Sequence, residues 1–287
     1  MKRTAIRLVS LTVLLLGIFA AQGFVATVAS AHTCGSNWCS GADGNTSSNV
    51  QGNGPQIYTG EVGTYFCDFG GSNCNAAFNG AGANNAYSRW KASTGMGVWY
   101  YYFTAGAGIS YESAYPSPYC FGWAQGYHAV VDAHNHFSQY YPSAWVMSMD
   151  IESPTSYGWY SSTQAQNRQV FDGFTDYVAG RGSADSRCTY RDGSGYNFQY
   201  GVYSDNSDWS YAMGSYGNSI PGTLKWTYQY SCYGSWPGSF VQAEWFADNN
   251  IREVWQYLHD CSAAGGHDYD VLYEPVYLPL YGITIGT

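Results

Sequence analysis

Residues 144–152 read AWVMSMDIE, an apolar run that ends in two acidic residues one position apart. A short apolar run of this kind is typical of a buried strand. Side chains at i and i+2 of a strand point the same way, with Cα atoms roughly 6.5–7 Å apart, so Asp150 and Glu152 are expected side by side. Two carboxyl groups this close do not ionise independently, and one can keep its proton and act as an acid. In the alternative interpretation, Asp150 caps the following segment and Glu152 is solvated.

Strand-like and helix-like segments alternate on both sides of this run. Further strands are expected at residues 62–69, 96–104, 198–204, 224–230, 241–247, 254–258 and 269–273, and helices at residues 83–93, 121–137 and 163–180. This alternation predicts an α/β fold with a parallel sheet, and we expect a single-domain, irregular (β/α)8 barrel of the TIM type. A doubly wound open sheet is the alternative, but no G-x-G-x-x-G follows a strand. In a barrel, Asp150 and Glu152 would line the mouth at the C-terminal strand ends.

The N-terminal segment has the features of a secretory signal. Basic residues stand at positions 2, 3 and 7, an apolar run covers 8–21, and an A-x-A pattern occupies 29–31. We therefore expect a secreted, extracellular protein with a signal peptide at 1–31, a Gly/Ser/Asn-rich extension at 32–56 and the barrel domain at 57–287. No later apolar stretch approaches the ~18 residues needed to span a bilayer.

The chain is acidic and aromatic. Loss of the signal would remove three of the eleven basic residues and none of the twenty acidic ones, so the formal charge would move from −9 to −12. Such a charge disfavours nucleic acid and anionic lipid as partners. Only 11% of the residues are charged, whereas 18% are aromatic, with 29 Tyr and 11 Trp. This excess suits core packing, stacking against sugar rings, or both.

All eight cysteines follow the expected cleavage point, which predicts a disulfide-stabilised protein. The expected local pairs are Cys34 with Cys39 and Cys67 with Cys74. The pairing of the other four stays open: Cys120, Cys188, Cys232 and Cys261. Because no C-x-x-C pair occurs and the six histidines are scattered, we expect neither a metal nor another cofactor.

Seven short segments follow one another in a characteristic order. They are GVWYYYF (97–103), AQ (124–125), DIE (150–152), GVYS (201–204), AEWFA (243–247), WQY (255–257) and DYDV (268–271). In this order they resemble segments of the family 25 glycoside hydrolases, the lysozyme-type enzymes. The first three resemble the family's third strand, the helix before its catalytic strand and the D-x-E of its fourth strand. The other four resemble strands five to seven and the closing strand. The resemblance spans residues 62–273, and its most specific part is WQY followed by an aspartate-bearing strand.

The resemblance implies hydrolysis of peptidoglycan between N-acetylmuramic acid and N-acetylglucosamine. It implies that Glu152 donates a proton to the leaving oxygen, that Asp150 stabilises positive charge or steers the N-acetyl group, and that Asp270 lines the same mouth. It further implies sugar-contacting or supporting walls at Tyr101, Tyr203, Trp245, Trp255 and Tyr257. The family opens with an aspartate-bearing strand and a second strand, whereas here one strong run, 62–69, precedes residue 96. Asp68 is therefore a candidate for the first aspartate, or lies on the second strand.

We expect a secreted glycoside hydrolase-like protein that cleaves glycosidic bonds of peptidoglycan or a related polysaccharide. One alternative is a non-catalytic glycan-binding barrel of the cell envelope, and another is a structural or host-interaction protein in which the D-x-E is incidental. The sequence does not decide the sugar and linkage, a retaining or inverting outcome, or the oligomeric state. An acidic chain would have to bind an anionic wall polymer by stacking and hydrogen bonds rather than by charge.

Overall fold

The computed structural model describes residues 38–43, 57–69, 97–137, 146–152, 156–190, 198–215, 224–228, 254–258 and 268–273. Eight strands lie in these ranges: β1 (Trp38–Asp43), β2 (Ile57–Thr64), β3 (Gly97–Phe103), β4 (Val146–Asp150), β5 (Gln199–Ser204), β6 (Leu224–Tyr228), β7 (Val254–Leu258) and β8 (Asp268–Tyr273). The helices are α2 (Tyr65–Asp68), the 3-10 helix η2 (Ser110–Ala114), α4 (Pro118–Phe137), α5 (Gln164–Val178) and α6 (Asn206–Met213).

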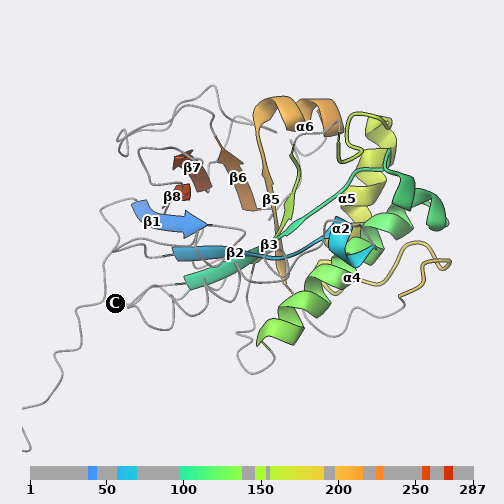
Figure 1. Cartoon of the computed structure of the whole chain (residues 1–287), viewed down its shortest axis with the longest axis horizontal. Coiled ribbons are helices and arrows are strands. Elements are labelled where there is room, and N and C mark those ends of the chain that lie inside the picture. Colours follow the sequence, from blue (N-terminus) through green and yellow to red (C-terminus); the bar gives the residue numbers. More distant parts are fainter. Residues whose placement is uncertain are drawn as a thin grey trace, which may run out of the picture.

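The strands pair in sequence order, and β8 pairs with β1 to close the ring (Figure 1). Neighbouring strands from β1 to β7 are parallel, whereas β8 is antiparallel to both β7 and β1. Only residues 259–267 separate β7 from β8, which is shorter than the crossover that a parallel pair needs. The expected α/β class with a parallel sheet is confirmed.

The two faces of the strands have different surroundings. Tyr100, Tyr102 and Met149 belong to the buried core that the sheet forms with α4 and α5. The alternate residue Tyr101 instead contacts Trp226 of β6, with ring centroids 5.6 Å apart. Because strand side chains alternate between faces, Tyr101 and its register neighbours face the interior of the ring.

Helices α4 and α5 lie side by side against the outside of the sheet (Figure 1). Helix α4 contacts β2 and β3, and α5 contacts β4 and β5. Glycines allow the two helix backbones to approach closely. A Cβ atom at Gly122 would lie 1.9 Å from the carbonyl oxygen of Val170, and one at Gly173 would lie 2.0 Å from that of Tyr119. Any larger side chain at these positions therefore has to push the helices apart.

Most of the expected elements are present, because their apolar spacing is strong. The expected helix at 163–180 is α5, and Thr163 caps it by accepting a hydrogen bond from the backbone N–H of Gln166. The expected strand at 254–258 coincides with β7. The expected helix at 83–93, the strand at 241–247 and the signal peptide lie outside the described residues.

The N-terminal half of the sheet differs from the expectation in two places. Strand β1 lies within 32–56, the segment expected to be an extension, so the sheet begins earlier than residue 57. The run at 62–69 is not one strand: β2 ends at Thr64 and α2 follows at once. Thr64 caps α2 by accepting a hydrogen bond from the backbone N–H of Cys67, which turns the chain out of the sheet.

One disulfide, Cys120–Cys188, joins α4 to the loop after α5. Cys67 is also disulfide-bonded, and its expected partner Cys74 lies outside the described residues, as do Cys34, Cys232 and Cys261. Across the described ranges, no helix combines the length and apolar character that crossing a membrane requires.

We expect Gly173→Ala to lower the free energy of unfolding by about 2 kcal/mol or more, because the added methyl group meets backbone rather than a movable side chain. Gly182→Ala is the control, since a Cβ there has no atom within 4 Å. Urea unfolding of both variants measures the difference. Equal stabilities would contradict the tight packing of α4 on α5.

Candidate functional site

The chain is held firmly where β4 ends. Asp150 is the last residue of the strand, and its carbonyl oxygen accepts hydrogen bonds from the backbone N–H and the side-chain hydroxyl of Thr104. The backbone N–H of Ile151 then donates to the carbonyl oxygen of Tyr203, at 2.9 Å. Asp150 is only 3% exposed, whereas Glu152, two residues further on, is half-buried. The two carboxyl groups therefore share one strand end but differ in their access to solvent.

Buried amide side chains from the helices fix the loops at this edge of the sheet. Gln125 of α4 accepts from the backbone N–H of Ala105 and donates to the carbonyl oxygen of Ala105. Asn167 of α5 accepts from the backbone N–H of Ala107 and donates to the carbonyl oxygens of Trp159 and Ala212. The loops after β3 and β4 and the end of α6 are thus bound to the two helices.

Carboxyl groups from three elements gather at this edge. Burial raises the pKa of Asp150 well above its usual range, and the negative charges of Glu152, Glu61 and Asp208 raise it further. Burial likewise raises the pKa of Glu61, with a further contribution from the charge of Glu152. Glu61 lies on β2 and Asp208 on α6. The structure therefore adds two acidic residues to the expected pair.

Asp208 is positioned by the first turn of α6. Asp205 caps this helix by accepting a hydrogen bond of 2.6 Å from the backbone N–H of Asp208. The carboxylate of Asp208 accepts hydrogen bonds from the hydroxyls of Tyr160, at 2.8 Å, and Tyr228, at 3.0 Å. The D-x-x-D spacing identifies a helix start in the sequence, but it does not show that the second aspartate is buried.

Aromatic rings lie on two sides of the carboxyl groups. On one side, the ring centroid of Tyr157 lies 4.7 Å from that of Phe103 and 6.0 Å from that of Tyr65. The charges of Glu152 and Asp150 help burial to raise the pKa of Tyr157, so its hydroxyl lies near the acids. On the other side, Tyr203 packs against Trp226, with centroids 4.4 Å apart.

Tyr101 and Tyr203, both expected in the site, lie in this second group of rings together with Trp226 and Tyr228. Both side chains are buried, as that of Asp150 is, so neither belongs to the exposed surface. The sequence pattern missed Trp226 because strand six was expected at 243–247. The sixth strand of the ring is β6, and Trp245 lies outside the described residues.

Three further residues expected in the site lie on β7 and β8 of the same ring: Trp255, Tyr257 and Asp270. The hydroxyl of Tyr203 donates to Gln256 of β7, at 2.5 Å. Asp270 of β8 is the register partner of Gln256 and of Gly41. The backbones of Trp255, Tyr257 and Asp270 belong to these strands, but their side chains lie outside the described part of the chain.

The structure places Asp68 away from Asp150 and Glu152. Asp68 ends α2 and accepts a 2.5 Å hydrogen bond from the hydroxyl of Tyr102, whose ring belongs to the core outside the sheet. Its carboxyl group also bonds to Asp132 of α4. The expectation that Asp68 lies on one of the first two strands is wrong: β2 ends at Thr64, and Asp68 belongs to the helix that follows.

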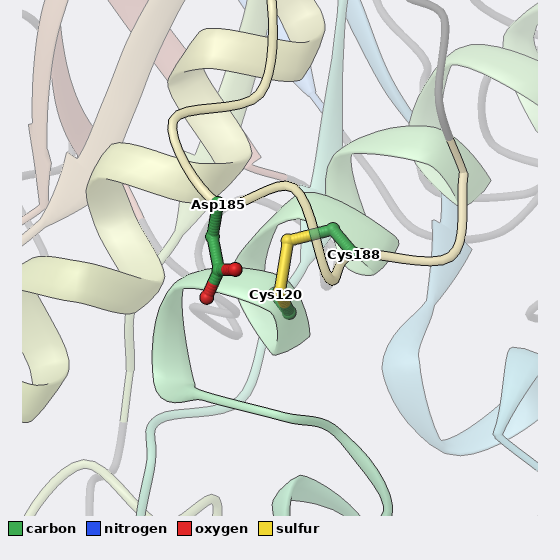
Figure 2. Close-up of side chains that lie close together, drawn as sticks. All are labelled: Cys120, Asp185 and Cys188. Atoms are coloured by element: carbon green, nitrogen blue, oxygen red, sulfur yellow. A yellow bond between two sulfur atoms is a disulfide. The ribbon is translucent and has the colours of Figure 1, made fainter.

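Within the described ranges, one group of side chains has the spacing of a metal site: Cys120, Asp185 and Cys188 (Figure 2). The two sulfur atoms are joined in the disulfide, so neither can be the thiolate that a metal binds. Asp185 accepts hydrogen bonds from Arg187 and from Ser117. This arrangement is a structural crosslink at the start of α4.

Asp132 makes the stability of the protein dependent on pH. Burial, the charge of Asp68 and their shared hydrogen bond raise the pKa of Asp132 to about 8. An ordinary aspartate has a pKa of about 4, so folding favours the protonated form. The stability from this proton is fully present below about pH 4 and is lost as the pH rises towards 8.

We expect the stability of Asp132→Asn to fall less between pH 4 and pH 8 than that of wild type, because asparagine stays neutral throughout the range. Melting temperatures measured from pH 4 to pH 9 on wild type and variant test the expectation. Asp176→Asn, which makes the same chemical change in α5, is the matched control. The same slope in Asp132→Asn and wild type would show that Asp132 does not hold this proton.

Neither a family model nor a curated protein sequence matches the chain. Solved structures do match it. A muramidase from Trichobolus zukalii aligns with 87% of this chain and 100% of its own, at a TM-score of 0.50 and 15% identity. The spore cortex lytic enzyme SleM from Clostridium perfringens aligns with 83% of this chain and 68% of its own, at a TM-score of 0.50 and 9% identity. A family GH25 lysozyme from Aspergillus fumigatus aligns with 87% of this chain and 100% of its own, at a TM-score of 0.46 and 13% identity.

At these identities the likeness is one of fold. The lysozyme-like fold implied by the sequence resemblance is confirmed, because the structure aligns with the full length of the Trichobolus zukalii muramidase. The chain therefore has a lysozyme-like fold of the type seen in muramidases, with its acidic D-x-E at the end of β4.

Proposed function

We propose that this protein is a secreted glycoside hydrolase that cleaves glycosidic bonds of peptidoglycan or a related polysaccharide, on an irregular (β/α)8 barrel of the TIM type. The observation that carries the proposal is the pair Asp150 and Glu152 at the end of β4. One carboxyl group is buried and the other is half-buried, within a lysozyme-like fold. Two carboxyl groups in different surroundings are what acid-assisted cleavage of a glycosidic bond requires.

Glu152 is suited to be the general acid. Its half-buried side chain follows the strand end, where a sugar can reach it, and it would give its proton to the oxygen of the leaving sugar. The loss of the leaving group places positive charge on the remaining sugar ring. A carboxylate in surroundings of low dielectric constant stabilises such charge strongly.

Asp150 is suited to the second role. Burial favours its protonated form in the free protein, and the positive charge that develops during cleavage favours its ionised form. Asp150 would then stabilise that charge or accept a hydrogen bond from the N-acetyl group of the substrate. Asp270, the register partner of Gln256, would supply a further carboxylate to the same site.

Some aromatic rings would contact the substrate directly, and others would support the site. Tyr157 is half-buried beside the acids and is placed to contact a sugar ring. Tyr101 and Tyr203 are buried and would support the site from within the ring. Trp245, Trp255 and Tyr257 are proposed as further wall residues on the basis of the sequence resemblance.

Secretion is part of the proposal. The disulfide Cys120–Cys188 supports it, because such bonds persist in oxidising compartments outside the cytosol. The basic and apolar pattern of residues 1–31 would direct export.

We expect Glu152→Gln to lower kcat on purified peptidoglycan by about 10²–10⁴-fold, because glutamine has no proton to give. Release of reducing ends by wild type and variant measures the effect. Glu112→Gln in η2 makes the same chemical change at a residue that is not among the charges acting on Asp150 and Glu61, and it should keep wild-type activity. A wild-type protein that binds glycan without cleaving any polymer would favour the non-catalytic alternative, a glycan-binding barrel.

We expect Asp150→Asn to lower kcat by about 10²-fold or more while leaving KM nearly unchanged, because asparagine cannot acquire the negative charge needed late in the reaction. Initial rates over a range of peptidoglycan concentrations separate the two parameters. If KM rose and kcat did not change, Asp150 would be a binding group rather than a stabiliser of the transition state.

A further inference from the structure

Helix α6 carries an exposed aromatic side chain, Tyr211. It is 66% exposed, and no other large apolar residue in the described ranges is exposed. The other tyrosines whose side chains are described are buried or half-buried. Single exposed rings are common on protein surfaces, so the meaning of this one depends on what holds it and where it lies.

The ring of Tyr211 packs against a second tyrosine that is itself fixed. This partner is Tyr160, in the loop after β4, and the two ring centroids lie 4.6 Å apart with the ring planes tilted by 39°. Tyr160 is half-buried, and its hydroxyl donates a 2.8 Å hydrogen bond to the carboxylate of Asp208. We call Tyr160 and Tyr211 the tyrosine pair. Tyr211 is its exposed member.

The backbone that carries Tyr211 is held by side chains of α5. The last four carbonyl groups of a helix have no partner within the helix. In α6 these are the carbonyl groups of residues 210–213, and each accepts a hydrogen bond from α5. The donors are Gln164, Asn167 and Arg168. The exposed ring therefore stands on a fixed support, so little conformational entropy would be lost when a ligand binds to it.

The tyrosine pair lies at the edge of the sheet that carries the acids. Strands β4 and β5 are parallel, so the loop after β4 and the helix after β5 leave the sheet at the same edge (Figure 1). The hydroxyl of Ser204, the last residue of β5, donates to the carbonyl oxygen of Ile151, at 2.9 Å. Asp208, which binds Tyr160, is also one of the charges that raise the pKa of Asp150. The pair is therefore joined to the acids through Asp208.

The side chains next to the tyrosine pair are polar and suit a sugar. Ser161 follows Tyr160 and Ser210 precedes Tyr211, and both serines are exposed. The side-chain amide of Gln164 reaches the backbone of Tyr211. An aromatic face beside hydroxyl and amide groups matches the C–H face and the hydroxyls of a pyranose ring. This surface would bind by stacking and hydrogen bonds, which is what an acidic chain needs in order to hold an anionic wall polymer.

We propose that the tyrosine pair is an outer sugar-binding subsite, in which a sugar ring of the polysaccharide strand, beyond the bond to be cleaved, stacks on Tyr211. This inference rests on the proposed function of the acids at the end of β4. It identifies the substrate as a strand of several sugar units, because a short fragment that fills only the site of the acids does not reach Tyr211. A contact so far from the reacting bond is the same in the ground state and in the transition state, so it lowers KM and leaves kcat unchanged.

Tyr211→Ala tests the proposal, because it removes the exposed ring. We expect KM for polymeric peptidoglycan to rise about 5–10-fold with kcat nearly unchanged, which is the effect of losing one aromatic contact. Tyr211→Phe keeps the ring and should keep the wild-type KM. Gln169→Ala, which shortens an exposed side chain of α5, is the control for truncation. An unchanged KM in a folded Tyr211→Ala protein, or an equal rise in Tyr211→Phe, would overturn the proposal.

Binding measurements separate the subsite from the reaction. Calorimetry in the Glu152→Gln background, with soluble glycan strands from peptidoglycan and with its N-acetylglucosamine–N-acetylmuramic acid disaccharide, compares long and short ligands. Adding Tyr211→Ala should raise Kd for the strands by the same factor and leave Kd for the disaccharide unchanged. If Tyr211→Ala does not fold, Tyr211→Gln, which keeps a long side chain without a ring, should give the same rise.

The two proposals fail in different ways. A wild-type protein that binds glycan strands through Tyr211 but cleaves no polymer would overturn the proposed function and support the subsite. Strand binding that does not weaken when the Tyr211 ring is removed, or that weakens equally for the disaccharide, would overturn the subsite whether or not the protein cleaves glycan.

Discussion

The arrangement of the carboxyl groups depends on two buried amide side chains, Gln125 and Asn167. Loops that leave a parallel sheet carry backbone N–H and C=O groups that need partners when they are buried. Gln125 meets this need for the loop after β3, and Asn167 meets it for three separate segments. Both lie on the long helices whose close contact relies on glycine. The position of the two helices therefore determines the position of the loops around the strand end that carries Asp150.

The acidic residues of the site differ in how far they could be predicted from the sequence, because some are positioned by a local pattern and others by contacts between distant elements. Asp150 and Glu152 were predictable because they end one apolar strand, where the alternation of side chains is a local property. Glu61 was not, because glycine on both sides of GEVG weakens the strand pattern and only the pairing with β3 reveals a bulge in β2. Asp208 was predictable as a first-turn residue of a helix, but its burial depends on two tyrosines from other elements. The fold was largely predictable for the same reason: β3, β7 and α5 have strong local patterns, whereas β1 is recognisable mainly by its partners.

The acidic character of the chain is unevenly distributed, and the sheet separates two groups that behave differently. Inside the ring, Glu61 and Asp150 are buried close to Glu152 and Asp208, whose charges add to the effect of burial on the pKa of Asp150. Outside it, Asp68 and Asp132 share a hydrogen bond beneath α4 and join the end of α2 to that helix. Perturbed carboxyl groups occur both at catalytic sites and at structural contacts. Each group includes a buried carboxyl oxygen without a hydrogen-bond partner, Oδ2 of Asp132 outside and Oε1 of Glu61 and Oδ1 of Asp150 inside. The groups differ in that the outer pair is joined by a hydrogen bond and accepts another from Tyr102, which ties α2, β3 and α4 together.

The antiparallel pairing of β8 with β1 has a consequence for how the protein reaches its folded state. These two strands are the last and the first in the described chain, so the ring closes only through contacts between residues very far apart in sequence. Folds dominated by such contacts form slowly, because the entropy of closing a long loop is lost before the contact is made. Until β8 arrives, β1 and β7 each present an open strand edge, which can pair with another chain. Because β8 ends at Tyr273, the ring can close only after nearly the whole chain has been synthesised, so the two open edges persist for most of synthesis.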